Sequence, residues 1–276
     1  MNKKRGLIAT YAVLSFFSLL VLIPIGYMLT TAMRSSAELL TQERATFFPQ
    51  QWTLDNFVAI WEKYPMLRYL LNSLLLTGTS TVAAVALSTF AGYGFSRFEF
   101  RTKGAVMLFI LATQMFPSVM LYVPYYKLLS MYGLNSSYIG IILVYTATVT
   151  PLCTWMMYGY FRAIPVELDE AANIDGAGRF RIFFQIVMPL TLPGLISTTI
   201  YAFIQGWNEY MFAMLITNSE SRKTLSVAVG QMAGAYSVEW NELMAASAVA
   251  SLPLVVLFLF LQRFFIGSMA GGAVKG

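Results

Sequence analysis

The side chains of this protein that could do chemistry gather in two short stretches of sequence. The stretch ELDEAANIDGAGRF, residues 167–180, holds four of the chain's thirteen acids between two long apolar segments: Glu167, Asp169, Glu170 and Asp175. The stretch YAFIQGWNEYMF, residues 201–212, places the carboxylate of Glu209 within an apolar sequence. Grouped charges can fix the register of a docked partner, whereas an acid inside a membrane segment usually faces the bundle interior or a water-filled cavity. The two stretches therefore predict a docking element and a polar path.

Several kinds of chemistry are excluded by composition. The chain has no histidine and a single cysteine, Cys153, which removes histidine-based metal sites, catalytic triads and disulfides within one chain. Cys153 lies in the apolar stretch TPLCTWMMYGYF, and we expect a buried, inert thiol. The chain has no P-loop motif for ATP. It also lacks the cluster of Lys and Arg that a nucleic-acid-binding surface would need. We expect no catalytic residue, no metal site and no cofactor bound by this chain.

The elements that must position these residues are membrane helices. Hydrophobic residues make up 58% of the 276-residue chain and charged residues only 11%, against about a quarter charged in soluble domains. A bilayer core needs about 20 apolar residues in helical form. We therefore predict an all-α integral membrane protein with a single transmembrane domain over residues 1–276. Its six transmembrane helices are expected near residues 7–33, 70–95, 104–127, 137–161, 192–216 and 243–265.

The distribution of basic residues orients these helices. With the N-terminus in the cytoplasm, eleven Lys and Arg residues fall in inner segments and seven in outer segments. The outer segments also hold seven acids, which balance the charge of their seven basic residues. This bias favours cytoplasmic N- and C-termini. The stretch 167–180 then faces the cytoplasm. Residues 34–68 and 217–242 form external loops long enough to meet an external partner, with a solvated connector as the alternative for each.

The acid-rich stretch has the pattern of a short surface helix. Its acids lie in the first turn, where the positive end of a helix favours negative charge. Leu168, Ala171 and Ala172 share one face, and small side chains on that face would let a partner approach closely. Asp175 and Gly176 form a turn signal, after which RFRIFFQIVM is expected to be helical. An ordinary re-entrant cytoplasmic loop is the alternative.

Polar side chains also recur along two of the predicted spans. In the fifth span, steps of three and four residues align Tyr201, Gln205, Asn208, Glu209 and Phe212. The third span carries a matching stripe of Gln114, Ser118, Tyr122 and Tyr125. Pro117 and Pro124 would bend the third span, which is tolerated where neighbours or water satisfy the freed backbone groups. Hydrogen-bonding groups and rings of this kind suit a path for a sugar. Helix–helix contacts are the alternative, as is pairing of Glu209 with another subunit.

The run EAANIDGAGRFRIFFQIVMP resembles the signature of the binding-protein-dependent ABC importer permeases. That signature reads Glu-Ala-Ala, three residues, Gly, nine residues, Ile-x-Leu-Pro. The matching positions are Glu170, Ala171, Ala172, Gly176, Ile186 and Pro189, with Met188 in the usual leucine place. The six predicted spans, the WNEY of the fifth span and the ending GGAVKG look like the maltose-type carbohydrate permeases, specifically the shorter partner of a pair.

The resemblance implies that the loop 162–189 couples this chain to an ATPase. The loop would carry a cytoplasmic coupling helix between spans four and five that sits in a cleft of the ATP-hydrolysing subunit. Glu170 would pair with a basic group there, and Gly176 would give the bend. The coupling residues carried over from the family are Glu170, Ala171, Ala172, Asp175, Gly176, Ile186 and Pro189. The tail 267–276 resembles a C-terminus that reaches the ATPase dimer interface, with a disordered end as the alternative.

The resemblance also implies partners, cargo and location. The partners would be an ABC ATPase dimer that binds the ATP and Mg, a second permease subunit in a heterodimer, and an extracellular solute-binding protein. The cargo would be a mono- or oligosaccharide, and the place the cytoplasmic (inner) membrane of a bacterium or archaeon, in contact with lipid. The residues expected along the sugar path are Gln114, Tyr122, Tyr125, Gln205, Asn208 and Glu209.

Two alternatives to a sugar importer remain. The same kind of importer could carry a glycerophosphodiester or an amino acid, although the spans lack the cation cluster that would favour an anion. A self-sufficient channel or secondary carrier often has several intramembrane acids or inverted repeats. Here Glu209 is the one acid within a predicted span, and no internal repeat occurs.

Overall fold

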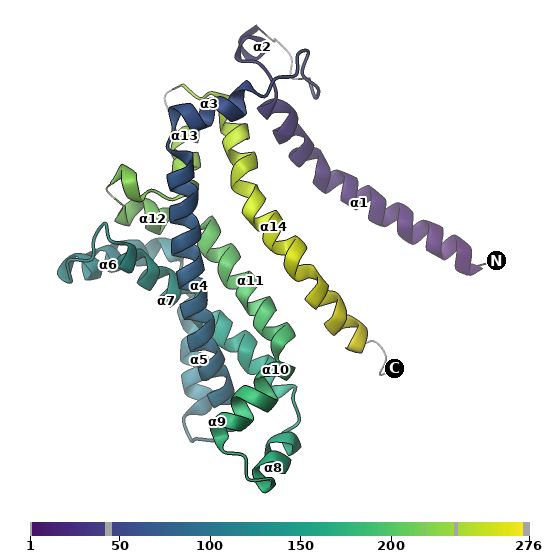
Figure 1. Ribbon diagram of the computed structural model, residues 1–276, viewed down its shortest axis with the longest axis vertical. Coiled ribbons are helices and arrows are strands. Elements are labelled where there is room, and N and C mark those ends of the chain that lie inside the picture. The colour runs from purple at the N-terminus through teal and green to yellow at the C-terminus, as the bar shows by residue number, and fades with distance from the viewer. Residues whose placement is uncertain (1, 42–45, 218, 235–236, 273–276) are drawn as a thin grey trace. The chain divides into compact units, whose positions relative to one another are not determined.

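The regular structure of this protein is helical. The computed structural model describes residues 2–41, 46–217, 219–234 and 237–272, and Figure 1 shows their course. Over these residues the one β element is an isolated antiparallel bridge between Arg34 and Trp52, and the helices are joined by turns and irregular segments. The predicted all-α class is confirmed.

Four helices are each long and apolar enough to cross a membrane as a single element. They are α1 (Asn2–Ala32), α4 (Met66–Arg97), α7 (Tyr138–Arg162) and α14 (Trp240–Gly272). They correspond to the first, second, fourth and sixth predicted spans. Pro24, Pro151 and Pro253 lie inside α1, α7 and α14 without ending them, as neighbouring groups allow in membrane helices.

The predicted third span is a bent pair of helical segments. Its parts are α5 (Lys103–Ala112), the 3₁₀ turn η1 (Thr113–Met115) and α6 (Ser118–Met131). The two arms meet at 100°, so the bend expected at Pro117 is a complete break. Proline has no N–H and disfavours helical backbone at the preceding residue, and Phe116 is indeed extended. Pro124 lies inside α6 and does not interrupt it.

The predicted fifth span is also divided. Before it come three short segments, α9 (Arg179–Arg181), the π-helix η2 (Ile182–Val187) and α10 (Met188–Leu190). They meet α11 (Leu192–Asn208) at 76°. With each bent pair counted as one, the candidate spans number up to six. The expectation of one helix through residue 216 is wrong, because α11 ends at Asn208 and α12 (Met211–Ile216) begins after a break.

By contacts, the chain divides into two compact units, Met1–Leu67 with Ala228–Leu252 and Arg68–Val227 with Pro253–Gly276. The first unit includes α2 (Ser36–Thr41) and α3 (Asp55–Lys63). The second includes α8 (Glu167–Ile174) and the 3₁₀ turn η3 (Glu220–Arg222). Helix α13 (Leu225–Ala233) has residues in both. The single domain over 1–276 stays a prediction.

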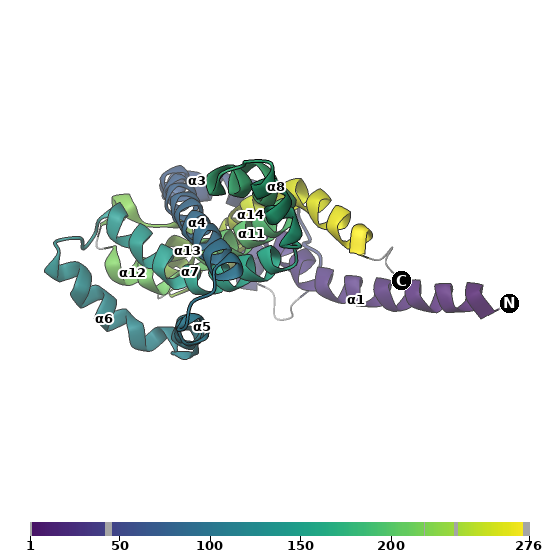
Figure 2. The same cartoon turned by 90° about the horizontal axis from the view of Figure 1, so that it is seen from below.

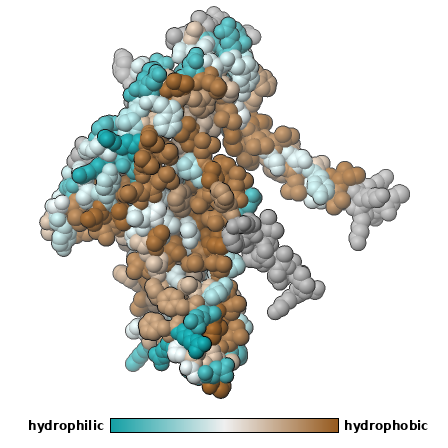
Figure 3. All heavy atoms as spheres, in the orientation of Figure 1, coloured by the Kyte–Doolittle hydropathy of each residue, from teal (hydrophilic) through white to brown (hydrophobic). Residues whose placement is uncertain are grey.

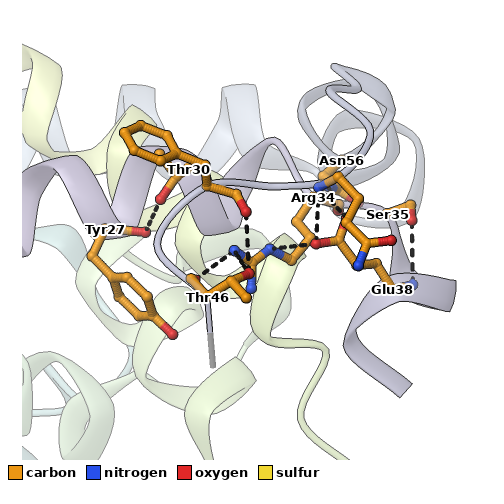
Figure 4. A network of polar contacts seen from close by, with 9 residues as sticks. Tyr27, Thr30, Arg34, Ser35, Glu38, Thr46 and Asn56 are labelled. Carbon is orange, nitrogen blue, oxygen red and sulfur yellow. Dashed lines mark hydrogen bonds and ion pairs between the residues drawn. The ribbon is translucent and has the colours of Figure 1, made fainter. Parts of the chain in front are cut away.

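A buried polar network closes the first unit around Arg34 (Figure 4). The guanidinium of Arg34 donates to the carbonyl of Thr46 at 2.8 Å and pairs with Glu38 at 3.3 Å. The side-chain amide of Asn56 donates to the carbonyl of Arg34 at 2.8 Å. At the other end of α3, Lys63 pairs with Glu242, and this hydrogen bond raises the pKa of Lys63. The first predicted external loop therefore contains folded structure and is not a plain solvated connector.

The core of the second unit lies where α4, α7 and α11 pack together, which Figures 1 and 2 show from two directions. Gly92 marks the closest approach of α4 to α7, because a Cβ there would lie 2.8 Å from Cβ of Met157 and from the backbone nitrogen of Tyr158. Cys153 of α7 is fully buried in this core, so the expected buried thiol is confirmed.

The exterior of the spans is apolar. None of the most hydropathic stretch of α1 is buried, and its exposed side chains include Phe16, Phe17 and Leu20. Figure 3 shows mostly hydrophobic residues along the described part of this helix, which suits contact with lipid. At the other end of the chain, α14 continues to Gly272 and includes the first part of the predicted tail. The last part of the predicted tail, residues 273–276, lies outside the described residues.

Candidate translocation cavity and coupling loop

The second unit contains a cavity of about 190 Å³ with neutral polar and aromatic walls. The lining residues come from η1, α6, α7, α11, α12 and the break before α12: Gln114, Ser118, Tyr122, Tyr145, Thr148, Val149, Tyr201, Gln205, Gly206, Glu209 and Phe212. Among them Glu209 is the one acid, and none is Lys or Arg. The structure thus brings together four residues expected on the path: Gln114, Tyr122, Gln205 and Glu209.

The other two residues expected on the path lie elsewhere. Tyr125 lines a smaller hollow of about 90 Å³, which shares Gln114 and Ser118 with the larger cavity. The side chain of Asn208 is exposed and lines neither space. Helical periodicity placed Asn208 beside Glu209, but the helix ends between these two residues.

The break in the predicted third span shapes one wall of the cavity. At the end of α5, the side-chain amide of Gln114 donates to the carbonyl of Thr148 at 3.2 Å, which holds η1 against α7. Beyond the break, α6 directs Tyr122 toward α12. The Tyr122 ring meets Phe212 edge to face, with ring centroids 4.5 Å apart. Edge-to-face packing fixes the ring and leaves its hydroxyl free to turn toward a polar solute.

Glu209 lies at the break between α11 and α12 and caps the second helix. Its backbone is extended. Its carboxylate accepts hydrogen bonds from the N–H groups of Phe212 at 2.8 Å and Ala213 at 3.0 Å. The first N–H groups of a helix have no partner within that helix, and here the side chain of the residue just before the N-cap Tyr210 satisfies two of them. The acid is thus held by its own chain.

The carbonyl group of Glu209 is held as well. The hydroxyl of Ser226 donates to it at 2.7 Å, and the hydroxyl of Tyr145 donates to it at 3.4 Å. Three separate elements of the second unit therefore meet at this residue. The sequence analysis missed Tyr145 and Ser226, because nothing in their local sequence distinguishes them from other polar side chains in apolar helices.

The coupling loop, residues 162–189, begins with the predicted surface helix α8. On this helix Glu170 and Ala171 are exposed, whereas Ala172 is buried. After Asp175, Gly176 adopts φ +81°, the left-handed conformation that favours glycine. The N–H of Gly176 donates to the carbonyl of residue 173 at 3.1 Å, and that of residue 177 to the carbonyl of Ala172 at 2.9 Å. This pair of bonds is the Schellman motif that ends many helices.

The second half of the coupling loop is packed against the core of its unit. Phe183 of the π-helix stacks near Tyr93, with ring centroids 4.7 Å apart, and near Phe161 at 6.2 Å. Ile186 is partly buried against the same cluster, while Pro189 is exposed in α10. The helical stretch expected after Gly176 is therefore present, with a π-turn inside it.

An ion pair anchors α8 to the cytoplasmic end predicted for α4. The guanidinium of Arg97 contacts the carboxylate of Asp169 at 2.8 and 3.4 Å. It also donates to the carbonyls of Phe161 at 3.1 Å and Ile164 at 3.2 Å. Sequence analysis did not assign Arg97 a role. Its position at the end of a long apolar run, facing a loop rich in acids, was the available signal.

Broken membrane helices around a polar and aromatic cavity, together with an anchored loop that carries exposed acids, are features expected of a membrane permease. The chain belongs to the family of binding-protein-dependent transport system inner membrane components, whose profile matches residues 84–270. It is a multi-pass permease subunit of an ABC importer.

Relatives of known name cover the whole length of the chain. The inner membrane ABC transporter permease protein YcjP of Escherichia coli (strain K12) is 33% identical over 100% of this chain and 99% of its own. The maltodextrin transport system permease protein MdxG of Bacillus subtilis (strain 168) is 33% identical over 98% of this chain and 96% of its own length. A crystal structure of a bacterial ABC transporter involved in import of the acidic polysaccharide alginate has a TM-score of 0.80 at 23% identity, over 96% of this chain and 98% of that one. That likeness supports the fold.

Proposed function

We propose that this permease carries a neutral mono- or oligosaccharide through the cavity beside Glu209. The observation that carries the proposal is the cavity wall, which combines tyrosine rings with glutamine, serine and threonine groups and has no basic side chain. Sugar hydroxyls need donors and acceptors, and sugar rings stack on aromatic faces. The relation to a maltodextrin permease supports the same cargo class. The residues of the path are Gln114, Tyr122, Tyr125, Gln205 and Glu209; Asn208, also expected there from the sequence, lines neither cavity.

The energy for transport comes from partner subunits. The chain pairs with a second permease subunit as a heterodimer, and an ATPase dimer binds ATP and Mg, so this chain binds no cofactor and hydrolyses nothing. The coupling loop docks on the ATPase through Glu170, Ala171 and Gly176, supported by Ala172, Asp175, Ile186 and Pro189. The N- and C-termini are cytoplasmic, and the tail 267–276 reaches toward the ATPase.

Transport then follows from alternation between two states. Closure of the ATPase dimer on ATP moves the coupling loop, and the spans switch from inward- to outward-facing. An external solute-binding protein releases its sugar into the outward-facing cavity. Hydrolysis returns the spans to the inward-facing state, and the sugar leaves on the cytoplasmic side.

The test is purification of the tagged chain from its own membranes in mild detergent, followed by mass spectrometry. We expect an ATPase and a second six-span protein to co-purify. The assembly is then reconstituted in vesicles with its binding protein, and ATP-dependent uptake of maltodextrin is compared with that of an alginate oligosaccharide. Uptake of the neutral sugar alone supports the proposal. An assembly of this chain alone that transports without ATP contradicts it, and so does preference for the acidic sugar.

A further inference from the structure

The turn at residues 219–226, called here the outer turn, is tied to the ends of two spans by buried amide and hydroxyl groups. Asn72 of α4 is only 7% exposed. Its amide nitrogen donates to the carbonyls of Ser221 at 3.0 Å and Lys223 at 2.8 Å, and its oxygen accepts from the hydroxyl of Tyr138 at 3.0 Å. Both donor hydrogens of the Asn72 amide are thus directed at the turn, and its oxygen accepts from α7.

The charged part of the outer turn is held in the same place. Glu220 accepts hydrogen bonds from Lys223 and from Tyr69 of α4, and these bonds lower the pKa of Glu220. Arg222 lies over the ring of Tyr138, 5.7 Å from its centroid. The carboxylate therefore links the turn to α4, and the guanidinium places the turn against the first residue of α7.

The end of the outer turn reaches the cavity. The N–H of Leu225 donates to the hydroxyl of Ser73 at 2.7 Å, which starts α13 beside α4. The next residue, Ser226, donates to the carbonyl of Glu209 at 2.7 Å. Glu209 in turn caps α12 through the N–H of Phe212, and Phe212 is part of the cavity wall. A short series of hydrogen bonds therefore runs from Asn72 through the turn to the wall.

We propose that Asn72 and Ser226 are positioning residues that couple the outer turn to the cavity wall at Glu209. Displacement of the turn carries Ser226 with it and pulls on the carbonyl of Glu209 at the break, where α11 ends at Asn208 and α12 begins only at Met211. Phe212 follows because the carboxylate of Glu209 is bonded to its N–H. A solute-binding protein docked on the external side would supply that displacement, so the role of the coupling rests on the proposed function.

The coupling is tested first by hydrogen exchange, which needs no transport activity. In the purified complete importer, Ser226→Ala should speed amide hydrogen exchange at Phe212 and Ala213 by about fivefold, the lower end of the usual range for coupling between two sites. Asn72→Asp should have the same effect. Asn72→Asp keeps the acceptor for Tyr138 and loses both donors to the turn. Ser219→Ala is the control, since the exposed Ser219 hydroxyl contacts that of Ser221 and, among the described residues, bonds to neither α4 nor the cavity wall. Unchanged exchange at Phe212 and Ala213 in both variants overturns the proposal.

The functional arm separates coupling from simple destabilisation. In the reconstituted importer, Ser226→Ala should lower the stimulation of ATPase activity by sugar-loaded binding protein about fivefold and leave the basal ATPase rate unchanged. Ser226→Thr keeps the hydroxyl and should restore stimulation. Equal loss of basal and stimulated rates means a structural role and contradicts the proposal. If the unmodified importer shows no stimulation by any neutral sugar, the proposed function fails, while the exchange result still decides the coupling.

Discussion

The coupling loop and the break at Glu209 both contain acids within an otherwise apolar chain. The surroundings of these acids differ between the two regions. In the coupling loop, Asp169 is paired with Arg97 in a partly buried site, while Glu170 is left exposed on α8. At the break, both oxygens of the Glu209 carboxylate accept backbone N–H groups of the same chain.

The difference teaches how to separate a docking acid from a structural one. An exposed acid on an anchored helix costs nothing to leave unpaired in water and is available to a partner. An acid within an apolar span must be satisfied inside the protein, since a carboxylate there costs about 2.5–3.5 kcal/mol on insertion scales. Glu170 thus suits contact with another subunit, whereas Glu209 stabilises a bend in its own chain.

Reversing the charge of the docking acid should have the largest effect on transport. We expect Glu170→Lys to abolish association with the ATPase and ATP-dependent uptake, because it places like charges together across the proposed interface. Glu170→Gln should be milder. The measurement is co-purification of the ATPase with the tagged chain, together with the amount of chain in the membrane. Normal uptake by Glu170→Lys would remove Glu170 from the docking site.

Removing the anchor of the coupling loop should come next. Arg97→Ala leaves Asp169 and two carbonyls without their donor, and breaking a buried pair from one side costs about 3–5 kcal/mol. We expect a lower melting temperature of the purified assembly and at least about tenfold slower uptake. Arg101→Ala is the control, because Arg101 is exposed. Equal effects of the two substitutions would show that net charge matters and the ion pair does not.

Weakening the cap at the break should have a smaller effect. In Glu209→Gln, the amide oxygen can accept only one of the N–H groups of Phe212 and Ala213, and the amide nitrogen faces the other. We expect the stability of the cap to fall by about 1 kcal/mol. We expect uptake to fall about fivefold with unchanged membrane abundance. Asn208→Ala serves as the comparison, since its side chain lines neither cavity. If Asn208→Ala slows uptake and Glu209→Gln leaves its kinetics unchanged, Glu209 is not part of the path.

A change of similar size is expected at the turn of the coupling loop. Gly176→Ala introduces a Cβ at φ +81°, where an L-residue costs about 1–2 kcal/mol, although no atom lies within 4 Å of that Cβ. We expect coupled ATPase activity to fall by about fivefold. Gly178→Ala is the matched control two residues away, because Gly178 has φ −70° and equally open space. Equal activities in the two variants would mean that the left-handed turn is not needed for docking.

Much of the fold followed from local sequence. Four spans are unbroken apolar runs, and any such run of about 20 residues must form a helix in lipid to satisfy its own backbone groups. The turn at Gly176 and the exposed acids of α8 were also readable, since glycine after a short acidic helix is a local signal. The register of the Glu-Ala-Ala run identified the family before any contact was known.

The partners of the charged and polar groups were decided by tertiary structure. The periodic spacing of polar residues around Glu209 predicts one continuous helix face. It does not reveal that the helix ends before Glu209, whose carboxylate then accepts the N–H groups of Phe212 and Ala213. Arg97 forms an ion pair with Asp169, 72 residues away in sequence. Ser226, in the first turn of α13, donates a hydrogen bond to the carbonyl of Glu209. Hydrophobic length and local propensity act within a few residues and were visible in the sequence. The satisfaction of buried charges and amides depends on which distant elements pack together, and only the folded chain fixes that.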